Sequence, residues 1–267
     1  MAPETETKKP TLSFSRATKM LKCPRLYYLE EIRRVETFAT GAMIQSSAWH
    51  EAVAKNFQQK IRSGVDLPVE QVVAIFMSRL DEKFKLENVR LKENENRPAI
   101  EAQGVAITEF FHATVALTIS PIFVEKYFRV SLGTAFPYDI TGIWDLVDID
   151  HRVIDLKAYS KTPSQKDIDK NMQLTWYGLA YRILFHEAEG GLGICAVIKN
   201  KLLRCETFST ARTTEDCMWL LGLIERAADA IGKGCDFPNP GGWWCGPDMC
   251  AQWDLCHAVE FHGGKKT

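Results

Sequence analysis

The chain has 267 residues, with 33 basic and 34 acidic side chains, a formal net charge of -1 and an apolar content of 46%. That length suits one large domain or two small ones, and the apolar fraction excludes global disorder. The near-zero charge gives no bulk reason to expect a nucleic-acid partner, so such binding would need a local patch.

The sequence contains neither a membrane span nor a secretory signal. No run of about 18 apolar residues occurs, and residues 1–7 are polar. We therefore expect a cytoplasmic protein. Its eight cysteines should be reduced there, because stable disulfides are rare in that compartment.

Helical patterns begin after a leader at residues 1–11 that we expect to be disordered. The hydroxyl of Ser13 or Ser15 can accept hydrogen bonds from the unpaired backbone N–H groups of a first helical turn. Pro24 suits the first position of a second helix. A further helix is expected over residues 46–62.

A long amphipathic stretch follows. Apolar residues recur at helical spacing from about residue 69 to about residue 130. A charge-rich segment at 85–97 within this stretch suits a helix end or a loop. We expect the helical block at about 60–135 to be an insertion in a single domain that covers residues 12–267.

The pattern changes to β-structure near residue 138. Two β-rich runs at 140–149 and 153–156 are separated by Asp150-His151-Arg152, which predicts a hairpin. The later elements are expected to be a helix over 170–186, a second hairpin formed by 192–197 and 202–208, and a helix over 214–232. The predicted fold class is α/β, with a small mixed central sheet flanked by helices.

Two aspartates and a lysine converge in the first predicted hairpin. Asp155 and Lys157 are two residues apart on one strand, so their side chains leave the same face, while Leu156 points the other way. Asp145 lies on the neighbouring strand within reach of the same point. Converging carboxylates repel each other, and a hard cation such as Mg²⁺ or Mn²⁺ relieves that repulsion. The lysine would stabilise negative charge, or help to deprotonate a water for attack on a phosphodiester.

The context of this motif matters, because a lone Asp-x-Lys is common and more often a solvated strand segment. Gln173 and Tyr177 follow it, four residues apart on one helix face. His50 precedes it, in the helix expected over 46–62. A lone histidine on such a helix is more often structural than a metal ligand.

Taken in order, these segments resemble the PD-(D/E)XK nuclease superfamily, specifically its RecB-like branch. The branch includes CRISPR-associated and recombination-linked exonucleases, iron–sulfur members and phage relatives. The segments that carry the resemblance are Leu12-Ser13-Phe14-Ser15, Cys23-Pro24-Arg25-Leu26-Tyr27-Tyr28, the His50 helix, Gly142-Ile143-Trp144-Asp145, Ile154-Asp155-Leu156-Lys157, Gln173 with Tyr177, and the C-terminal cysteines.

The resemblance implies roles for the site residues. His50, Asp145, Asp155 and the Leu156 carbonyl would be metal ligands, and Lys157 would be the catalytic lysine. The same resemblance would have Gln173 and Tyr177 contact the DNA backbone or support the site. The chain departs from the family in having Ser46 and Ser47 where a glycine often precedes the histidine.

Four of the eight cysteines fall between Cys235 and Cys256. In a reducing compartment such a group is expected to bind a metal rather than to form disulfides. The iron–sulfur members of the branch combine one cysteine of a Cys-Pro-Arg segment with three near the C-terminus. The residues that match this plan, within a cysteine-rich segment at 235–257, are Cys23, Cys245, Cys250 and Cys256.

Alternatives to a [4Fe–4S] cluster stay open on the sequence. Four residues separate Cys245 from Cys250, where the family commonly has two. Structural Zn²⁺, with Cys235 or His257 as a substitute ligand, is one alternative, and unmetallated cysteines are another. The remaining cysteines, which are expected to be buried and apolar in character, are Cys195, Cys205 and Cys217.

Basic and aromatic residues offer nucleic-acid contacts. The basic residues of the N-terminal segment are Lys8, Lys9, Arg16, Lys19, Lys22, Arg25, Arg33 and Arg34, and those after the aspartate–lysine strand are Lys161, Lys166 and Lys170. They could flank a phosphate-binding groove, although a solvated surface explains any single lysine equally well. Tyr159 and Trp176 could stack on bases, and Trp176 could instead pack in the core.

The function that we predict is a metal-dependent DNA nuclease. An exonuclease acting on single-stranded DNA ends through a metal-activated water is favoured over an endonuclease, with a helicase, recombination or CRISPR protein as a partner. The alternative is a nucleic-acid-binding or scaffold protein that keeps the fold without cutting. Intact Asp145, Asp155 and Lys157 favour the enzyme.

Overall fold

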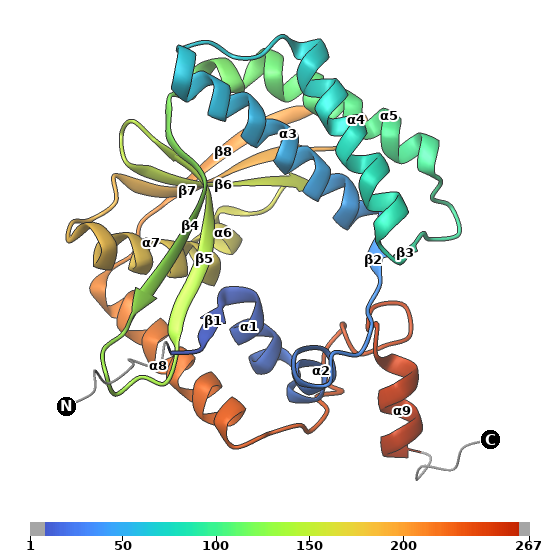
Figure 1. Cartoon of the computed structure of the whole chain (residues 1–267), viewed down its shortest axis with the longest axis vertical. Coiled ribbons are helices and arrows are strands. Elements are labelled where there is room, and N and C mark those ends of the chain that lie inside the picture. Colours follow the sequence, from blue (N-terminus) through green and yellow to red (C-terminus); the bar gives the residue numbers. More distant parts are fainter. Residues whose placement is uncertain (1–8, 262–267) are drawn as a thin grey trace, which may run out of the picture. The chain divides into compact units, whose positions relative to one another are not determined.

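A computed structural model describes residues 9–261 of the chain (Figure 1). It divides into two compact units. The terminal unit comprises the chain up to residue 37, residues 129–142 and the chain from 218, and the central unit comprises 38–128 and 143–217. Of the leader expected at 1–11, residues 1–8 lie outside the described part, and Thr11 already belongs to a strand.

The terminal unit begins with strand β1 (Thr11–Ser13), which pairs in parallel with the start of β5 (Asp139–Asp148). Helix α1 (Phe14–Lys22) follows, and its N-cap is Ser13, whose hydroxyl accepts a hydrogen bond from the Arg16 N–H at 3.4 Å. Pro24 opens α2 (Pro24–Tyr27), as predicted, and a π-helical turn continues it over Tyr28–Ile32. The C-terminal segment adds α9 (Trp253–Phe261), a helix that the sequence patterns did not indicate.

The central unit contains three long helices. They are α3 (Gly41–Ser63), α4 (Val69–Leu86) and α5 (Arg97–Thr114), with a 3-10 turn at Ala116–Thr118 after α5. Two short strands, β2 (Ala39–Thr40) and β3 (Val89–Arg90), pair in parallel beside them. The charge-rich segment at 85–97 thus holds the end of α4, a short strand and a loop.

Besides β1, the strands of the sheet are β4 (Pro121–Ser131), β5, β6 (Arg152–Tyr159), β7 (Gly191–Ile198) and β8 (Arg204–Thr210). Within the central unit β5 and β6 are antiparallel, β6 and β7 parallel, and β7 and β8 antiparallel. The crossover between the parallel strands contains α6 (Gln165–Asp169) and α7 (Met172–Phe185). Helix α8 (Thr214–Gly232) follows β8. The predicted α/β class, with a mixed sheet flanked by helices, is confirmed (Figure 1).

A further difference from the sequence prediction concerns residues 121–131. Helix was expected to continue to about residue 130, but residues 121–131 form strand β4. Phe128 and Val130 are buried, whereas Tyr127 beside them is 56% exposed. This alternation has the period of a strand. The segment is also rich in β-branched and aromatic residues, which favour strands, and Pro121 stands at its start.

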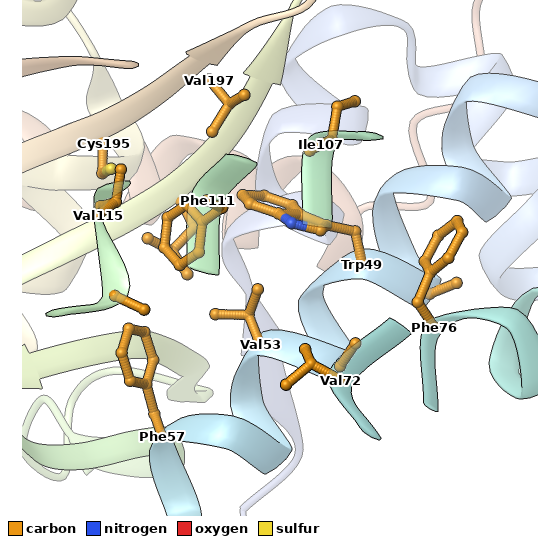
Figure 2. Packing of buried hydrophobic residues seen from close by; sticks show 14 of the residues in the cluster. Trp49, Val53, Phe57, Val72, Phe76, Ile107, Phe111, Val115, Cys195 and Val197 are labelled. Atoms are coloured by element: carbon orange, nitrogen blue, oxygen red, sulfur yellow. The ribbon is translucent and has the colours of Figure 1, made fainter. Parts of the chain in front are cut away.

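The core of the central unit forms between α3, α4, α5 and one face of the sheet (Figure 2). Trp49 and Phe57 of α3 both pack edge-to-face against Phe111 of α5, with ring centroids 5.3 and 6.1 Å apart. Helices α4 and α5 approach closely at Gly104, where a Cβ atom would overlap the Phe76 ring. This packing fixes the rotation of α3 about its axis, and with it the direction of the residue after Trp49, which is His50. None of the described helices is long and apolar enough to cross a membrane.

Candidate active site

The β5–β6 hairpin brings Asp145 and Asp155 together. Its register pairs Leu146 with Ile154 and Val147 with Val153, so Asp145 and Asp155 are the next residues of the two strands beyond these pairs. A carboxylate oxygen of Asp145 accepts a hydrogen bond from the Leu156 N–H at 2.9 Å. Asp155 is only 1% exposed. The structure therefore places two carboxylates side by side in a largely buried position.

Lys157 lies on the same face as Asp155. Its Nζ is 3.1 Å from Oδ1 and 3.0 Å from Oδ2 of Asp155. The intervening Leu156 side chain is buried in the core on the other face, as strand alternation requires. Burial opposes protonation of Lys157, but the charges of Asp155 and Asp145 outweigh it and hold the pKa of Lys157 above its usual value. The lysine is a fixed positive charge beside the carboxylates.

One cation does not neutralise this site. Burial, followed by the charge of Asp145, raises the pKa of Asp155 to about 6. Burial also raises the pKa of Asp145. A raised pKa means that the carboxylate anion is destabilised in the folded protein. A further positive charge nearby would stabilise that anion. The site is therefore electrostatically prepared for a cation.

His50 reaches the carboxylates from α3. Its Nδ1 lies 3.6 Å from Oδ2 of Asp145. Burial, and then the positive charge of Lys157, lower the pKa of His50 to about 4. The imidazole is therefore neutral near pH 7, which is the state that can donate a lone pair to a metal.

Glu125 of β4 completes a group that sequence reasoning missed. Three potential ligand atoms, one from each of His50, Glu125 and Asp145, lie within 4.8 Å of one another. This is close enough for the three residues to share a metal ion. Glu125 has a left-handed φ of 47°, unusual for a residue other than glycine and for a position within a strand. Part of the Glu125 side chain is exposed to solvent. Its pKa is nevertheless raised to about 7, first by partial burial of the carboxyl group and then by the charges of Asp145 and Glu51.

Gln173 and Tyr177 lie together on α7. The Gln173 side-chain amide donates a hydrogen bond to the Tyr177 hydroxyl at 2.8 Å. Burial, then the charges of Asp145 and Asp155, raise the pKa of Tyr177. The phenol is thus neutral and close enough to the two carboxylates to feel their charge. The structure brings this predicted pair to the edge of the carboxylate group.

The first turn of α7 is held by a buried arginine. Asn171 is the N-cap and accepts hydrogen bonds from the Gln173 and Leu174 N–H groups. Arg212 donates to the carbonyl oxygens of Ile168 and Asn171 at 3.0 and 3.1 Å. Because five-donor guanidinium groups satisfy several carbonyls at once, Arg212 fixes the turn from which Gln173 projects.

The four cysteines predicted as a ligand set line one pocket of the terminal unit. The pocket has a volume of about 170 Å³ and is lined by Cys23, Cys245, Cys250 and Cys256 together with aromatic and aliphatic side chains. Cys235 is not among its lining residues. Hydrogen bonds hold the C-terminal segment on the N-terminal helices. The Arg25 N–H donates to the Phe237 carbonyl, the Arg25 guanidinium to Asp236, and the Asn239 side chain to the Lys22 carbonyl.

Several predicted phosphate contacts are occupied within the protein. Lys9 donates to the Gly133 and Phe136 carbonyls, Lys19 pairs with Glu30 and Glu31, and Arg25 pairs with Asp236. The suggestion that Trp176 stacks on bases is wrong, because its side chain is fully buried. The three basic residues predicted as contacts after the aspartate–lysine strand are all exposed, and they are Lys161, Lys166 and Lys170. These lysines, with half-buried Tyr159, stay predicted contacts.

Comparisons with known proteins identify the family and the fold. A family model of the PD-(D/E)XK nuclease superfamily matches residues 11–257. A solved structure from Eubacterium rectale, of a candidate exonuclease, is 12% identical, with a TM-score of 0.59 over 88% of this chain and 86% of that one. The structure of SSO0001 is 13% identical, with a TM-score of 0.44 over 96% of this chain and 89% of that one. No curated protein matches the sequence.

Proposed function

The chain belongs to the PD-(D/E)XK nuclease superfamily, and from that premise we propose that it is a Mg²⁺- or Mn²⁺-dependent deoxyribonuclease that degrades single-stranded DNA from an end. The observation that carries this proposal is the buried group of Asp145, Asp155 and Lys157, with His50 and Glu125 beside it. A scaffold protein has no need to pay the desolvation free energy of two adjacent buried carboxylates.

The residues present suit a hard divalent cation. Carboxylate oxygens are the ligands preferred by Mg²⁺ and Mn²⁺, and one neutral imidazole is compatible with Mn²⁺. His50, Glu125 and Asp145 already converge within 4.8 Å. Asp155 and the Leu156 carbonyl complete the ligand set that we propose. Glu125 is an addition to the set expected from the sequence.

The bound cation would supply Lewis-acid polarisation of a phosphodiester and an activated water. Lys157 then stabilises the negative charge that develops on the phosphate. Its ion pair with Asp155 holds the ammonium group in place. Gln173 and Tyr177, which are hydrogen-bonded to each other, would contact the DNA backbone or support the site.

The preference for DNA ends is proposed from the structural comparison. The structural relative from Eubacterium rectale is described as a candidate exonuclease, and it shares the fold at 12% identity. A helicase, recombination or CRISPR protein is the partner class that we propose, as expected from the resemblance. We also propose that residues 12–267 act as one nuclease domain with a helical insertion at about 60–135, since the family match runs through both compact units.

Digestion of matched linear and circular DNA tests the proposed activity. With Mn²⁺ present, an exonuclease degrades end-labelled linear single strands and leaves circular single strands intact. Nicking of the circles would instead identify an endonuclease. Binding of DNA without cleavage in Mg²⁺ or Mn²⁺ would favour the scaffold alternative, and activity that persists in excess EDTA would contradict the metal requirement.

Metal binding is expected to strengthen between about pH 5 and pH 8. Ligands must be deprotonated to bind a metal, and the pKa values of Asp155 and Glu125 are raised to about 6 and about 7. His50 does not titrate in this range, because its pKa is lowered to about 4. Calorimetric titration of the apo protein with Mn²⁺ should give an affinity at least about tenfold higher at the upper end of the range.

A comparison of the wild-type protein with the Glu125→Gln variant tests whether Glu125 causes the pH dependence of the affinity for Mn²⁺. This variant should lose most of the change in affinity above pH 6, where Glu125 titrates in the wild-type protein. An affinity for Mn²⁺ that is independent of pH in the wild-type protein would show that these carboxylates do not bind the ion.

We further propose that Cys23, Cys245, Cys250 and Cys256 hold a [4Fe–4S] cluster. All four line one pocket. Tetrahedral zinc, with Zn–S bonds of about 2.3 Å, needs its sulfur atoms roughly 3.8 Å apart. Among the described residues, no three potential metal-ligand atoms within 4.8 Å of one another include a cysteine sulfur. A compact zinc site is therefore not preformed among the described residues, and we propose the cluster on the shared pocket and the ligand plan.

Anaerobically purified protein is expected to be brown and to contain about four iron atoms per chain. Cys250→Ser should abolish the colour and lower the iron content, because three thiolates hold a cubane cluster poorly. Cys217→Ser is the matched control, since Cys217 is a buried cysteine of the central unit and should leave the iron content unchanged. Stoichiometric zinc without iron would overturn the cluster.

A further inference from the structure

Two cysteines of the central unit touch each other on the sheet face that carries the Leu156 side chain, which is opposite to the face of Asp155 and Lys157. Sγ of Cys195 on β7 lies 3.2 Å from Sγ of Cys205 on β8, and both are free thiols. The strands are antiparallel neighbours whose register pairs Cys195 with Thr207 and Cys205 with Val197. The thiols therefore meet across a diagonal of the ladder, on one face of the sheet. Sequence reasoning predicted only that these cysteines are buried and apolar in character.

The two thiols have different surroundings. Cys195 is 2% exposed and belongs to the core cluster (Figure 2), whereas Cys205 packs against that cluster on β8 and stays partly open to solvent. The thiol–thiol contact with Cys195 lowers the pKa of Cys205. The same contact, together with burial, raises the pKa of Cys195. Thiolate character and exposure govern cysteine reactivity. Cys205 is therefore the cysteine that reacts first, and Cys195 is the resolving cysteine.

We propose that Cys195 and Cys205 form a redox-active pair that hydrogen peroxide converts into a reversible disulfide. The Cys205 thiolate attacks a peroxide oxygen, so that an S–O bond forms, the O–O bond breaks, and the departing hydroxide takes up a proton as water. The product is a sulfenic acid on Cys205.

The second step follows from the contact between the sulfur atoms. The Cys195 sulfur attacks the Cys205 sulfur, the S–O bond breaks, and the departing hydroxide leaves as water with the Cys195 proton. Two thiols lose two electrons in total, and one peroxide is reduced to two waters. The sulfur atoms must close from 3.2 Å to a bond of about 2.05 Å. This small displacement makes disulfide formation faster than further oxidation of Cys205.

Peptide mapping of the full-length protein tests this directly. Trypsin cleaves after Lys199, Lys201 and Arg204, so Cys195 lies in peptide 183–199 and Cys205 in peptide 205–212, with one cysteine in each. After brief peroxide treatment and alkylation, we expect these peptides linked, with alkylation of Cys205 lowered at least about tenfold. Dithiothreitol should release both peptides. If both cysteines stay fully alkylated, or Cys205 accumulates as a sulfinic acid without any linked peptide, the pair is not redox-active.

A single variant separates the two roles. In Cys195→Ser the second step is blocked, and Cys205 should be trapped as a sulfenic acid by a cyclic dione probe. Cys217→Ser is the matched control, because it removes another buried thiol and should leave the linked peptides unchanged. A cross-link of Cys205 to some other cysteine in the wild-type protein would also overturn the proposal. None of these measurements depends on nuclease activity or on iron content.

Discussion

Asp155→Asn is expected to lower the rate of DNA hydrolysis by at least about 10³-fold, the scale seen when a group that stabilises transition-state charge is removed. The substituted amide would keep the shape of the side chain but would lose the negative charge that we propose binds the cation. It would also remove the ion pair that holds Lys157, whose Nζ lies 3.0–3.1 Å from both Asp155 oxygens. Single-turnover digestion of end-labelled DNA with Mn²⁺ measures the loss.

The stability of this variant distinguishes a chemical effect from a folding defect. Because the folded state raises the pKa of Asp155 from 3.8 to about 6, the folded apo protein binds more protons than the unfolded chain in that interval. The free energy of unfolding therefore falls as pH rises through it. Asp155→Asn removes this loss, so the melting temperature of metal-free protein near pH 8 should not fall below that of wild type. Full activity in the purified variant would contradict the assignment of Asp155.

A matched control comes from the surface of α3. Lys55 is exposed on the same helix as His50, and Lys55→Ala should change neither the rate nor the melting temperature measurably. Lys157→Ala is the informative comparison, because it removes a cation and leaves Asp145 and Asp155 facing each other. This variant should lose activity. Its melting temperature should also rise more with added Mn²⁺ than that of the wild-type protein does.

The sequence predicted the part of the site that lies on one hairpin. Strand alternation placed Asp155 and Lys157 on one face, and a short turn brought Asp145 beside them. Such information is local, because fewer than fifteen residues separate the partners. Helical spacing likewise placed Gln173 and Tyr177 together on α7, where the structure shows them hydrogen-bonded.

Glu125 could not be found in the same way. It belongs to a strand that was expected to be helical, and its neighbours carry no catalytic pattern. The left-handed φ of 47° that turns this residue is set by tertiary packing rather than by its own preference. A single glutamate 20 residues before Asp145 gives no signal in the sequence. Only the meeting of β4 with β5 and α3 identifies it.

The thiol pair shows the same limit for β-structure. The hairpin of β7 and β8 was predicted, but contact between Cys195 and Cys205 depends on register, and a shift by one residue would turn one sulfur to the other face. The terminal cysteines differ, because the resemblance to a family had already grouped them. The structure places that group in one pocket.

Phe111→Ala is expected to reduce the free energy of unfolding by about 3–5 kcal/mol, as for other large-to-small changes of buried aromatic residues. Phe111 is 2% exposed and meets Trp49 and Phe57 edge-to-face (Figure 2). The variant loses the transfer free energy of the ring and both aromatic contacts, and it leaves a cavity between α3 and α5. Chemical denaturation of metal-free protein measures the change. Leu117→Ala is the control, since Leu117 is 65% exposed just beyond α5 and should alter stability by less than about 0.5 kcal/mol.

The same change should weaken metal binding, because the core and the site share helix α3. Trp49 packs on Phe111, and its neighbour His50 has its ring 5.2 Å from the Trp49 ring and its Nδ1 3.6 Å from Asp145. When the cavity allows Trp49 to move, the imidazole loses the support that holds it toward the carboxylates. Phe111→Ala should therefore lower the affinity for Mn²⁺, measured well below its melting temperature, whereas Leu117→Ala should not. An unchanged affinity alongside the expected loss of stability would show that His50 is positioned independently of the core.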